Sequence, residues 1–219
     1  MKDITALVIG ATGLVGNELV HQLLDDDRFG TVLIFVRRST GIQHVKLKEY
    51  LVNFDHPGEW KHLVKGDVLF SALGTTIKKA GSKEGQYKID HNYQYHFAKA
   101  AAENQVPVYV LVSSAMASER SRMFYTRMKG ELERDVKLLP FQHIHIMQPG
   151  MLEGDRKEKR TGEIIGLFVL KLINKLGIAL KQKPVPASVV AKAMINVSFK
   201  KDKRVSIYAL TEVFRAAGL

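Results

Sequence analysis

Short apolar runs alternate with amphipathic stretches along the first 150 residues of the chain. The runs predict six strands, at residues 4–9, 32–36, 50–54, 68–73, 108–112 and 144–147. Between most of them apolar residues recur at helical spacing, which predicts helices over residues 14–24, 58–64, 90–104 and 121–138. Strands that alternate with helices pair in parallel through right-handed crossovers. The sequence therefore predicts an α/β fold with a doubly wound, mostly parallel Rossmann sheet and helices on both faces.

The pattern changes after Gly150. A charged loop precedes a strongly apolar stretch over residues 164–180, and a further helix begins near Pro186. We expect a single domain over residues 1–219, because the remaining chain is too short for a second one. Residues 151–219 would form a small helical cap, with some of them returning to the sheet. Lys171 and Lys175 interrupt the apolar stretch at helical spacing. This spacing favours an amphipathic helix that covers a substrate site. A subunit contact or a membrane-surface helix is the alternative.

A glycine-rich turn, Gly10-Ala-Thr-Gly-Leu-Val-Gly16, follows the first predicted strand and opens the first predicted helix. In this context Gly10 permits the bend, Gly13 lets the backbone approach a pyrophosphate, and Gly16 lets helix and strand pack closely. The helix N-terminus then offers free N–H groups and positive potential to phosphates. The turn predicts a dinucleotide-binding site, and a simple packing turn is the alternative.

The end of the second predicted strand carries Arg37 and Arg38 and no carboxylate. A site selective for NAD usually has an acidic residue there, which accepts a hydrogen bond from the adenosine 2′-hydroxyl. Two guanidinium groups instead suit a 2′-phosphate. The sequence therefore favours NADP(H) as the cofactor, and two solvated arginines are the alternative.

Two Tyr/Lys pairs four residues apart occur in the chain, Tyr95/Lys99 and Tyr125/Lys129. On a helix such a pair points the same way, and the ammonium group stabilises the phenolate so that the tyrosine can transfer a proton. The spacing alone is weak evidence, because chance supplies such pairs. Ser114 follows the fifth predicted strand and shortly precedes Tyr125, whereas Tyr95 lies before that strand. We therefore expect Ser114, Tyr125 and Lys129 to be catalytic, and Tyr95 to pack.

A second glycine element, Leu73-Gly74, follows the fourth predicted strand, where the backbone commonly passes the nicotinamide-side ribose. The residues expected to bind the cofactor come from both glycine elements, the arginine pair and the Tyr/Lys pair. They are Gly10, Thr12, Gly13, Leu14, Val15, Gly16, Arg37, Arg38, Leu73, Gly74, Tyr125 and Lys129.

These motifs resemble those of the atypical short-chain dehydrogenases/reductases, and within them the subgroup of the human Tat-interacting oxidoreductase. The matching segments follow in the same order between about residues 4 and 156: 10–16, 73–82, 89–91, 110–114, 124–131, 148–150 and 154–156. The resemblance implies a Rossmann fold, NADP(H), and a Ser–Tyr–Lys active site at Ser114, Tyr125 and Lys129. Asp90 stands where other short-chain dehydrogenases have an Asn that relays protons through water. This difference affects the proton relay and therefore the turnover that the resemblance implies. Gln148 stands where many have Arg.

The first hypothesis is a single NAD(P)-binding Rossmann domain that acts as an NADPH-dependent oxidoreductase. Hydride would pass between the nicotinamide and a small carbonyl or alcohol, with Tyr125 transferring the proton, Lys129 binding the ribose and Ser114 orienting the oxygen. The alternative is an NADPH-binding regulatory or interaction protein with little or no turnover. Sugar-nucleotide epimerisation is disfavoured, because the C-terminal part is short for holding a nucleotide diphosphate-sugar.

Composition narrows these classes further. The chain has no cysteine, which excludes disulfides, thiol catalysis and iron–sulfur clusters, and its eight histidines are scattered, so we expect no metal site. The net charge is +11, and 14 Lys and Arg against 6 Asp and Glu follow Gly150. We expect this tail to serve a small-molecule substrate and not nucleic acid. The apolar run at the N-terminus is too short for a signal peptide or an integral membrane segment, so a cytoplasmic protein is expected. Homo-oligomerisation is left open.

Overall fold

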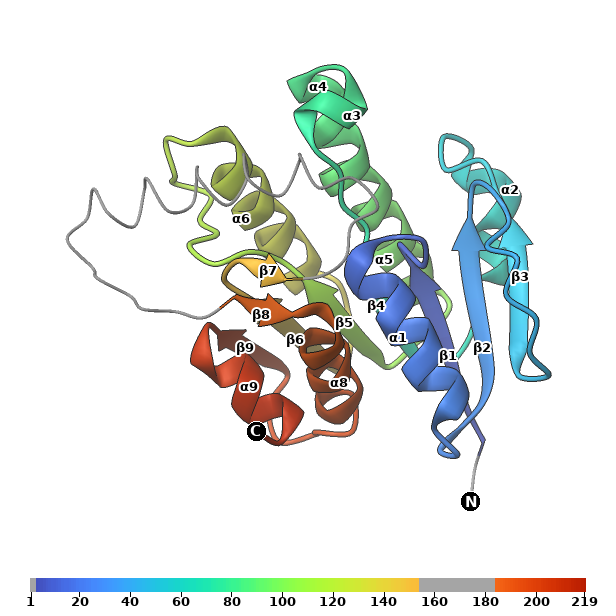
Figure 1. The fold of residues 1–219 in the computed structure, drawn as a ribbon. Coiled ribbons are helices and arrows are strands. Elements are labelled where there is room, and N and C mark those ends of the chain that lie inside the picture. Colours follow the sequence, from blue (N-terminus) through green and yellow to red (C-terminus); the bar gives the residue numbers. More distant parts are fainter. Residues whose placement is uncertain (1–2, 154–183) are drawn as a thin grey trace.

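The computed structural model describes residues 3–153 and 184–219, and its centre is a seven-stranded sheet (Figure 1). The strands lie in the order β3-β2-β1-β4-β5-β6-β9, and every neighbouring pair is parallel. Their bounds are β1 Ile4–Ile9, β2 Phe29–Val36, β3 Leu47–Leu51, β4 Val68–Ser71, β5 Val108–Val112, β6 His143–Gln148 and β9 Val205–Ala209. The predicted α/β fold with a doubly wound, parallel Rossmann sheet is confirmed.

Helices cover both faces of the sheet. On one face lie α1 (Leu14–Asp25), α8 (Ala187–Val197) and α9 (Thr211–Ala217). On the other lie α2 (Pro57–Trp60) with the 3₁₀ helix η1 (Lys61–Leu63), α5 (Gln94–Glu103) and α6 (Phe124–Lys137). The short helices α3 (Ile77–Ala80) and α4 (Lys83–Tyr87) follow β4, and a π-helix, η2 (Lys88–Tyr93), leads into α5. Two hydrophobic cores, one on each face, hold these layers together.

Strand β1 shows why the apolar runs form the centre of the sheet. Ala6 and Val8 belong to the core on one face, Leu7 and Ile9 to the core on the other, and all four are fully buried. Side chains alternate between the faces of a strand, so a central strand with helices on both sides needs apolar residues at every position. Because of this requirement, the central strands appear in the sequence as continuous apolar runs and can be predicted from them.

The third strand differs from its prediction at residues 50–54. Strand β3 is the edge of the sheet and begins at Leu47, with Lys48 and Glu49 inside it. An edge strand tolerates polar side chains, so its start leaves no apolar signal. Phe54 is buried through contacts outside the sheet, since its ring packs against that of Phe97 at 5.0 Å between centroids.

The described part of the tail returns to the body of the molecule. Strand β9 pairs with β6, α8 packs against α1, and the short strands β7 (Leu152–Glu153) and β8 (Val185–Pro186) pair beside the main sheet. Residues 184–219 thus extend the sheet and cover one of its faces. The predicted helix over residues 164–180, with Lys171 and Lys175, lies outside the described residues. Within the described ranges, no helix is long and apolar enough to cross a membrane.

Candidate functional site

The glycine turn lies at the carboxyl end of β1 and packs closely against the backbone of the segment after β4. Gly10 has φ +85°, and a Cβ atom there would come within 2.4 Å of the Ala72 carbonyl carbon. Only glycine combines this conformation with this approach. The Gly13 N–H donates to Gly10 O at 2.8 Å and closes the turn. The turn is therefore fixed in shape before any ligand arrives.

The turn opens helix α1 in the way that a phosphate site requires. Thr12 and Gly13 are exposed, Leu14 is half-buried, and Val15 and Gly16 are buried. Among the described residues no side chain caps this helix, because Gly13 stands at the N-cap position. The first N–H groups of the helix thus have no side-chain partner among the described residues, which suits an anionic ligand.

Arg37 and Arg38 leave the sheet beside this turn. Strand β2 pairs with β1 so that Phe35 lies opposite Ile9, one residue before Gly10. Both arginines are exposed, and neither has an ion-pair or hydrogen-bond partner among the described residues. Just beyond them, Glu49 of β3 accepts hydrogen bonds from Thr40 N–H at 2.8 Å and Thr40 Oγ1 at 2.7 Å. The loop is thereby anchored while its guanidinium groups stay available.

Leu73 and Gly74 lie on the other side of the glycine turn. Strand β4 pairs with β1, and Leu73 is half-buried while Gly74 is exposed. Next to them, the Thr75 N–H donates to Asp90 Oδ1 at 2.7 Å, and Gln86 Nε2 donates to Thr75 O at 3.0 Å. Residues from α4 and η2 therefore hold this segment in place.

Ser114, Tyr125 and Lys129 lie on adjoining elements at the end of β5. Ser114 is half-buried, and its Oγ donates to the Ala115 carbonyl at 3.2 Å. Tyr125 and Lys129 are one turn apart on α6, so their side chains leave the same side of the helix. Tyr125 is half-buried and Lys129 is 3% exposed. No bond joins the three side chains to one another within the described residues, and their catalytic roles stay a prediction.

The segment between Ser114 and Tyr125 is pressed against α6. Ser118 N–H donates to the Thr126 carbonyl at 3.0 Å. A Cβ atom on Gly130 would come within 2.2 Å of Glu119 N. The glycine directly after Lys129 therefore lets this segment cross the helix that carries the Tyr/Lys pair.

Asp90 is a buried carboxyl group that interacts electrostatically with the Lys129 ammonium. It lies on the π-helix η2 and is 1% exposed. Burial raises the pKa of Asp90 to about 6, against the opposing effects of the Lys129 charge and the Thr75 N–H. Within the described residues Lys129 has no ion-pair partner within 4 Å. A titratable acid thus interacts electrostatically with the proposed catalytic lysine.

The other Tyr/Lys pair has a different setting. Tyr95 packs against the hydrophobic core, with its ring centroid 6.3 Å from that of His91. Lys99 is exposed and lies 3.9 Å from Glu103. These contacts support the packing role expected for Tyr95.

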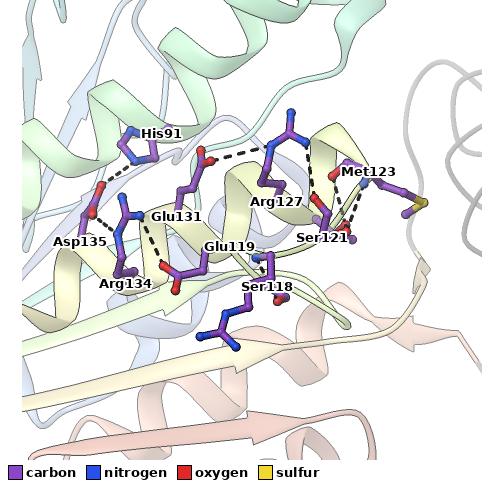
Figure 2. A network of polar contacts seen from close by, with 11 residues as sticks. His91, Ser118, Glu119, Ser121, Met123, Arg127, Glu131, Arg134 and Asp135 are labelled. Atoms are coloured by element: carbon purple, nitrogen blue, oxygen red, sulfur yellow. Dashed lines mark hydrogen bonds and ion pairs between the residues drawn. The ribbon is translucent and has the colours of Figure 1, made fainter.

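A polar network runs over the outer side of α6, as Figure 2 shows. His91 Nε2 lies 3.0 Å from Asp135 Oδ2, and Arg134 bridges Asp135 at 2.7 Å and Glu119 at 3.3 Å. Further along the helix, Arg127 lies 3.8 Å from Glu131. The network ties η2 and the Ser118–Glu119 segment to α6.

A pocket of about 300 Å³ lies between α4 and the first part of α6. It is lined by Tyr87, Phe124, Arg127, Met128 and Glu131. Burial raises the pKa of Tyr87 to about 12, with a further contribution from Glu131. None of the residues predicted to bind cofactor or to act in catalysis lines this pocket.

The sequence missed one buried polar group in this region. Glu133 of α6 is 4% exposed and contacts Ser113 and Gln148, which stand at the ends of β5 and β6. Its partners lie 20 and 15 residues away along the chain. The spacing of the sequence therefore gave no signal for the cluster, although the unusual Gln148 marked one of its members.

The histidines on β6 have structural partners. His145 is fully buried, and its Nε2 lies 3.2 Å from Lys200 O. Burial lowers the pKa of His145 to about 4. Over residues 3–153 and 184–219, no group of three or more His, Asp or Glu side chains is arranged to hold a metal ion.

Comparison with known proteins agrees with the fold. The profile of the NAD(P)H-binding family matches residues 10–164. Among solved structures, an NAD⁺ complex of the Bordetella bronchiseptica enzyme WbmH has a TM-score of 0.72 at 13% identity, over 94% of this chain and 75% of that one. A Methanobrevibacter ruminantium UDP-N-acetylglucosamine 4-epimerase has a TM-score of 0.72 at 17% identity, over 95% and 77%. At these identities the likeness shows the fold alone.

The curated relatives are Fmp52 proteins. The Aspergillus fumigatus protein is 34% identical over 201 residues, covering 88% of this chain and 86% of the relative. The Eremothecium gossypii protein is 36% identical over 203 residues, covering 90% of both. These relatives support the broader family and not the Tat-interacting subgroup named from the motifs.

Their names also correct the expected location. The relatives are named mitochondrial proteins, so the expectation of a cytoplasmic protein is wrong. That expectation depended on the absence of an apolar leader, a signal that does not report on mitochondria. The chain belongs to the NAD(P)H-binding family, and the Fmp52 proteins are its relatives.

Proposed function

We propose that the protein is an NADPH-dependent oxidoreductase of the atypical short-chain dehydrogenase/reductase type, acting on a small carbonyl or alcohol. The observation that carries this proposal is the position of Tyr125 and Lys129, one turn apart on α6, the helix that follows Ser114 and the end of β5. In a parallel sheet, ligands bind outside the carboxyl ends of the strands, and Ser114 follows the carboxyl end of β5. We further propose that the chain is mitochondrial like its named relatives.

The three side chains have distinct roles in this proposal. Tyr125 exchanges a proton with the substrate oxygen, and Ser114 orients that oxygen. Lys129 is buried without an ion-pair partner in the described chain, so its charge is available to stabilise the phenolate and to bind the ribose. When bound, the nicotinamide cofactor supplies or accepts the hydride.

The cofactor site combines the glycine turn, the arginine pair and Leu73-Gly74. The uncapped start of α1 suits the pyrophosphate, and the unpartnered guanidinium groups of Arg37 and Arg38 suit the 2′-phosphate. This combination favours NADPH over NADH.

The test is turnover of NADPH with a panel of aldehydes, ketones and quinones, followed by the absorbance of the reduced nicotinamide. Tyr125→Phe removes only the phenolic hydroxyl, and we expect turnover to fall about 10²-fold or more while NADPH still binds. Tyr95→Phe is the matched control and should leave turnover unchanged, because Tyr95 packs against the core.

The alternative, an NADPH-binding regulatory protein, is favoured by Asp90. This buried acid interacts with the charge of Lys129, which the phenolate would otherwise use. Tight NADPH binding without turnover of any substrate in the panel would replace the enzyme by this alternative.

A further inference from the structure

Glu133 joins three elements through one buried carboxylate. It lies on α6, and its Oε1 accepts a hydrogen bond from Ser113 Oγ at 2.5 Å. Gln148 Nε2 donates to both of its oxygens, at 2.9 and 3.0 Å. Ser113 directly follows β5 and Gln148 ends β6. A single side chain thereby fastens a helix to the ends of two neighbouring strands.

Two of these elements, α6 and the end of β5, carry the residues of the proposed active site. Tyr125 and Lys129 lie eight and four residues before Glu133 on the same helix, and Ser114 follows Ser113. Backbone bonds complete the arrangement, since Ser113 N–H donates to Met147 O at 2.7 Å and Ala115 N–H donates to Pro149 O at 3.0 Å. Ser113 is therefore held through its hydroxyl and through its backbone N–H, and the next residue inherits its position.

Stability alone is a poor reason for this carboxylate. Burying a charge costs free energy, and well-packed apolar groups often stabilise such a position equally well. Lys137 Nζ, at 3.7 Å from Oε2, offsets part of that cost. What directional hydrogen bonds add is a fixed geometry between the groups they join.

We propose that Glu133 is a positioning residue, which holds Ser114 in place relative to Tyr125 and Lys129 through its bonds to Ser113 and Gln148. Glu133 touches neither substrate nor cofactor in this proposal. The inference rests on the proposed oxidoreductase function.

The test removes the hydrogen-bond donors without changing any charge. Ser113→Ala and Gln148→Ala each delete one partner of Glu133, and Ser198→Ala is the matched control. Ser198 follows the last residue of α8, is 8% exposed and donates to Ile195 O at 2.7 Å. We expect Ser113→Ala to lower kcat about tenfold or more while the NADPH Kd stays within about twofold, because small misplacements of catalytic groups are costly.

A conservative variant separates positioning from general disruption. Glu133→Gln keeps one oxygen that can accept from Ser113, so it should retain more kcat than Glu133→Ala. Equal kcat in Ser113→Ala and Ser198→Ala would overturn the inference, whatever the stability of either variant.

A second measurement distinguishes failure of the proposed oxidoreductase function from failure of the positioning role of Glu133. If the unmodified protein turns over no substrate, the inference is decided by the ring resonances of Tyr125 in ¹³C-tyrosine-labelled protein, assigned by their loss in Tyr125→Phe. Resonances that shift in Ser113→Ala and Gln148→Ala but not in Ser198→Ala support positioning through Glu133. Resonances that stay in place in all three variants overturn it.

Discussion

Arg37 and Arg38 are the residues from which the preference for NADPH should arise. Each is exposed beside the glycine turn and unpartnered in the described chain. One or two charge-assisted bonds to a 2′-phosphate are worth about 1.5–3 kcal/mol each, so NADPH should bind at least about tenfold more tightly than NADH. Replacing both by alanine should remove the preference and leave NADH binding nearly unchanged, as measured by fluorescence titration.

The control for this pair changes the same charge elsewhere. Lys200 and Lys201 are exposed and lie between α8 and β9, far along the chain from the glycine turn. Their double alanine variant should keep the preference. Equal affinities of the unmodified protein for NADPH and NADH would contradict the assignment.

Asp90 should make the protein less stable as the pH rises through about 4 to 6. Its pKa is raised to about 6 in the native state, from 3.8, so the native state binds more protons than the unfolded state in this window. The free energy of unfolding then falls with rising pH, by up to about 3 kcal/mol for this shift. Asp90→Asn keeps an oxygen for the Thr75 N–H and should be more stable than the unmodified protein at pH 7.

Chemical denaturation between pH 4 and 8 measures this difference. It should shrink toward pH 4, where Asp90 is protonated in the native state and becomes increasingly protonated in the unfolded state as well. Asp135→Asn is the opposite control. Burial acts to raise the pKa of Asp135, but hydrogen bonds from Arg134 and His91 lower it overall. Its loss should therefore destabilise the protein at pH 7 and by nearly the same amount down to about pH 4, because stability from a lowered pKa is lost only below the ordinary value of 3.8. An Asp90→Asn variant less stable than the unmodified protein at pH 7 would refute the prediction.

At the scale of elements, the close crossing of α6 by the segment after β5 predicts the effect of Gly130→Ala. In an open helix this change stabilises by about 1 kcal/mol, because alanine is the better helix former. Here the new Cβ would meet the backbone of Ser118 and Glu119 at 2.2 Å. We expect a loss of roughly 1–3 kcal/mol instead, measured by urea unfolding. Gly58→Ala in α2, where nothing lies within 4 Å, is the control, and a stabilised Gly130→Ala would show that the crossing is loose.

The sequence predicts elements well where burial on both sides leaves an apolar run. The bounds of β1 and β5 agree with their predictions, since both strands are central. The edge strand β3 was misplaced, and β9 was not placed at all, because edge strands carry mixed side chains. The π-helix η2 also escaped, since its extra residue per turn is set by packing and not by helical spacing.

The residues of the candidate site also fall into two groups, those that the sequence can predict and those that it cannot. The glycine turn and the Tyr/Lys pair are local patterns, so the sequence contains them. The clusters around Asp90 and Glu133 join residues from different elements, which only the folded chain brings together. Local spacing could therefore name the groups proposed to react but not those that hold them in place.

At the scale of the whole molecule, only part of the net charge of +11 is available to bind nucleic acid or anionic lipid. Several cations of the described chain are already engaged: Lys88 lies 2.6 Å from Asp55, and Arg204 donates to the carbonyls of Lys137 and Leu139. Charge that is spread over a surface and partly engaged makes a poor phosphate-binding stripe, unlike a continuous run of free cations.

We therefore expect no sub-micromolar binding to duplex DNA or to anionic lipid vesicles at physiological salt. Gel shifts and vesicle sedimentation measure the two. A protein that engaged six phosphates would lose about 10³-fold in DNA affinity between 50 and 200 mM salt, so a steep salt dependence would be the signature of true nucleic-acid binding. Sub-micromolar binding in either assay, unaffected by NADPH and retained in Tyr125→Phe, would place the basic surface outside the cofactor site. It would then favour the regulatory protein over the enzyme.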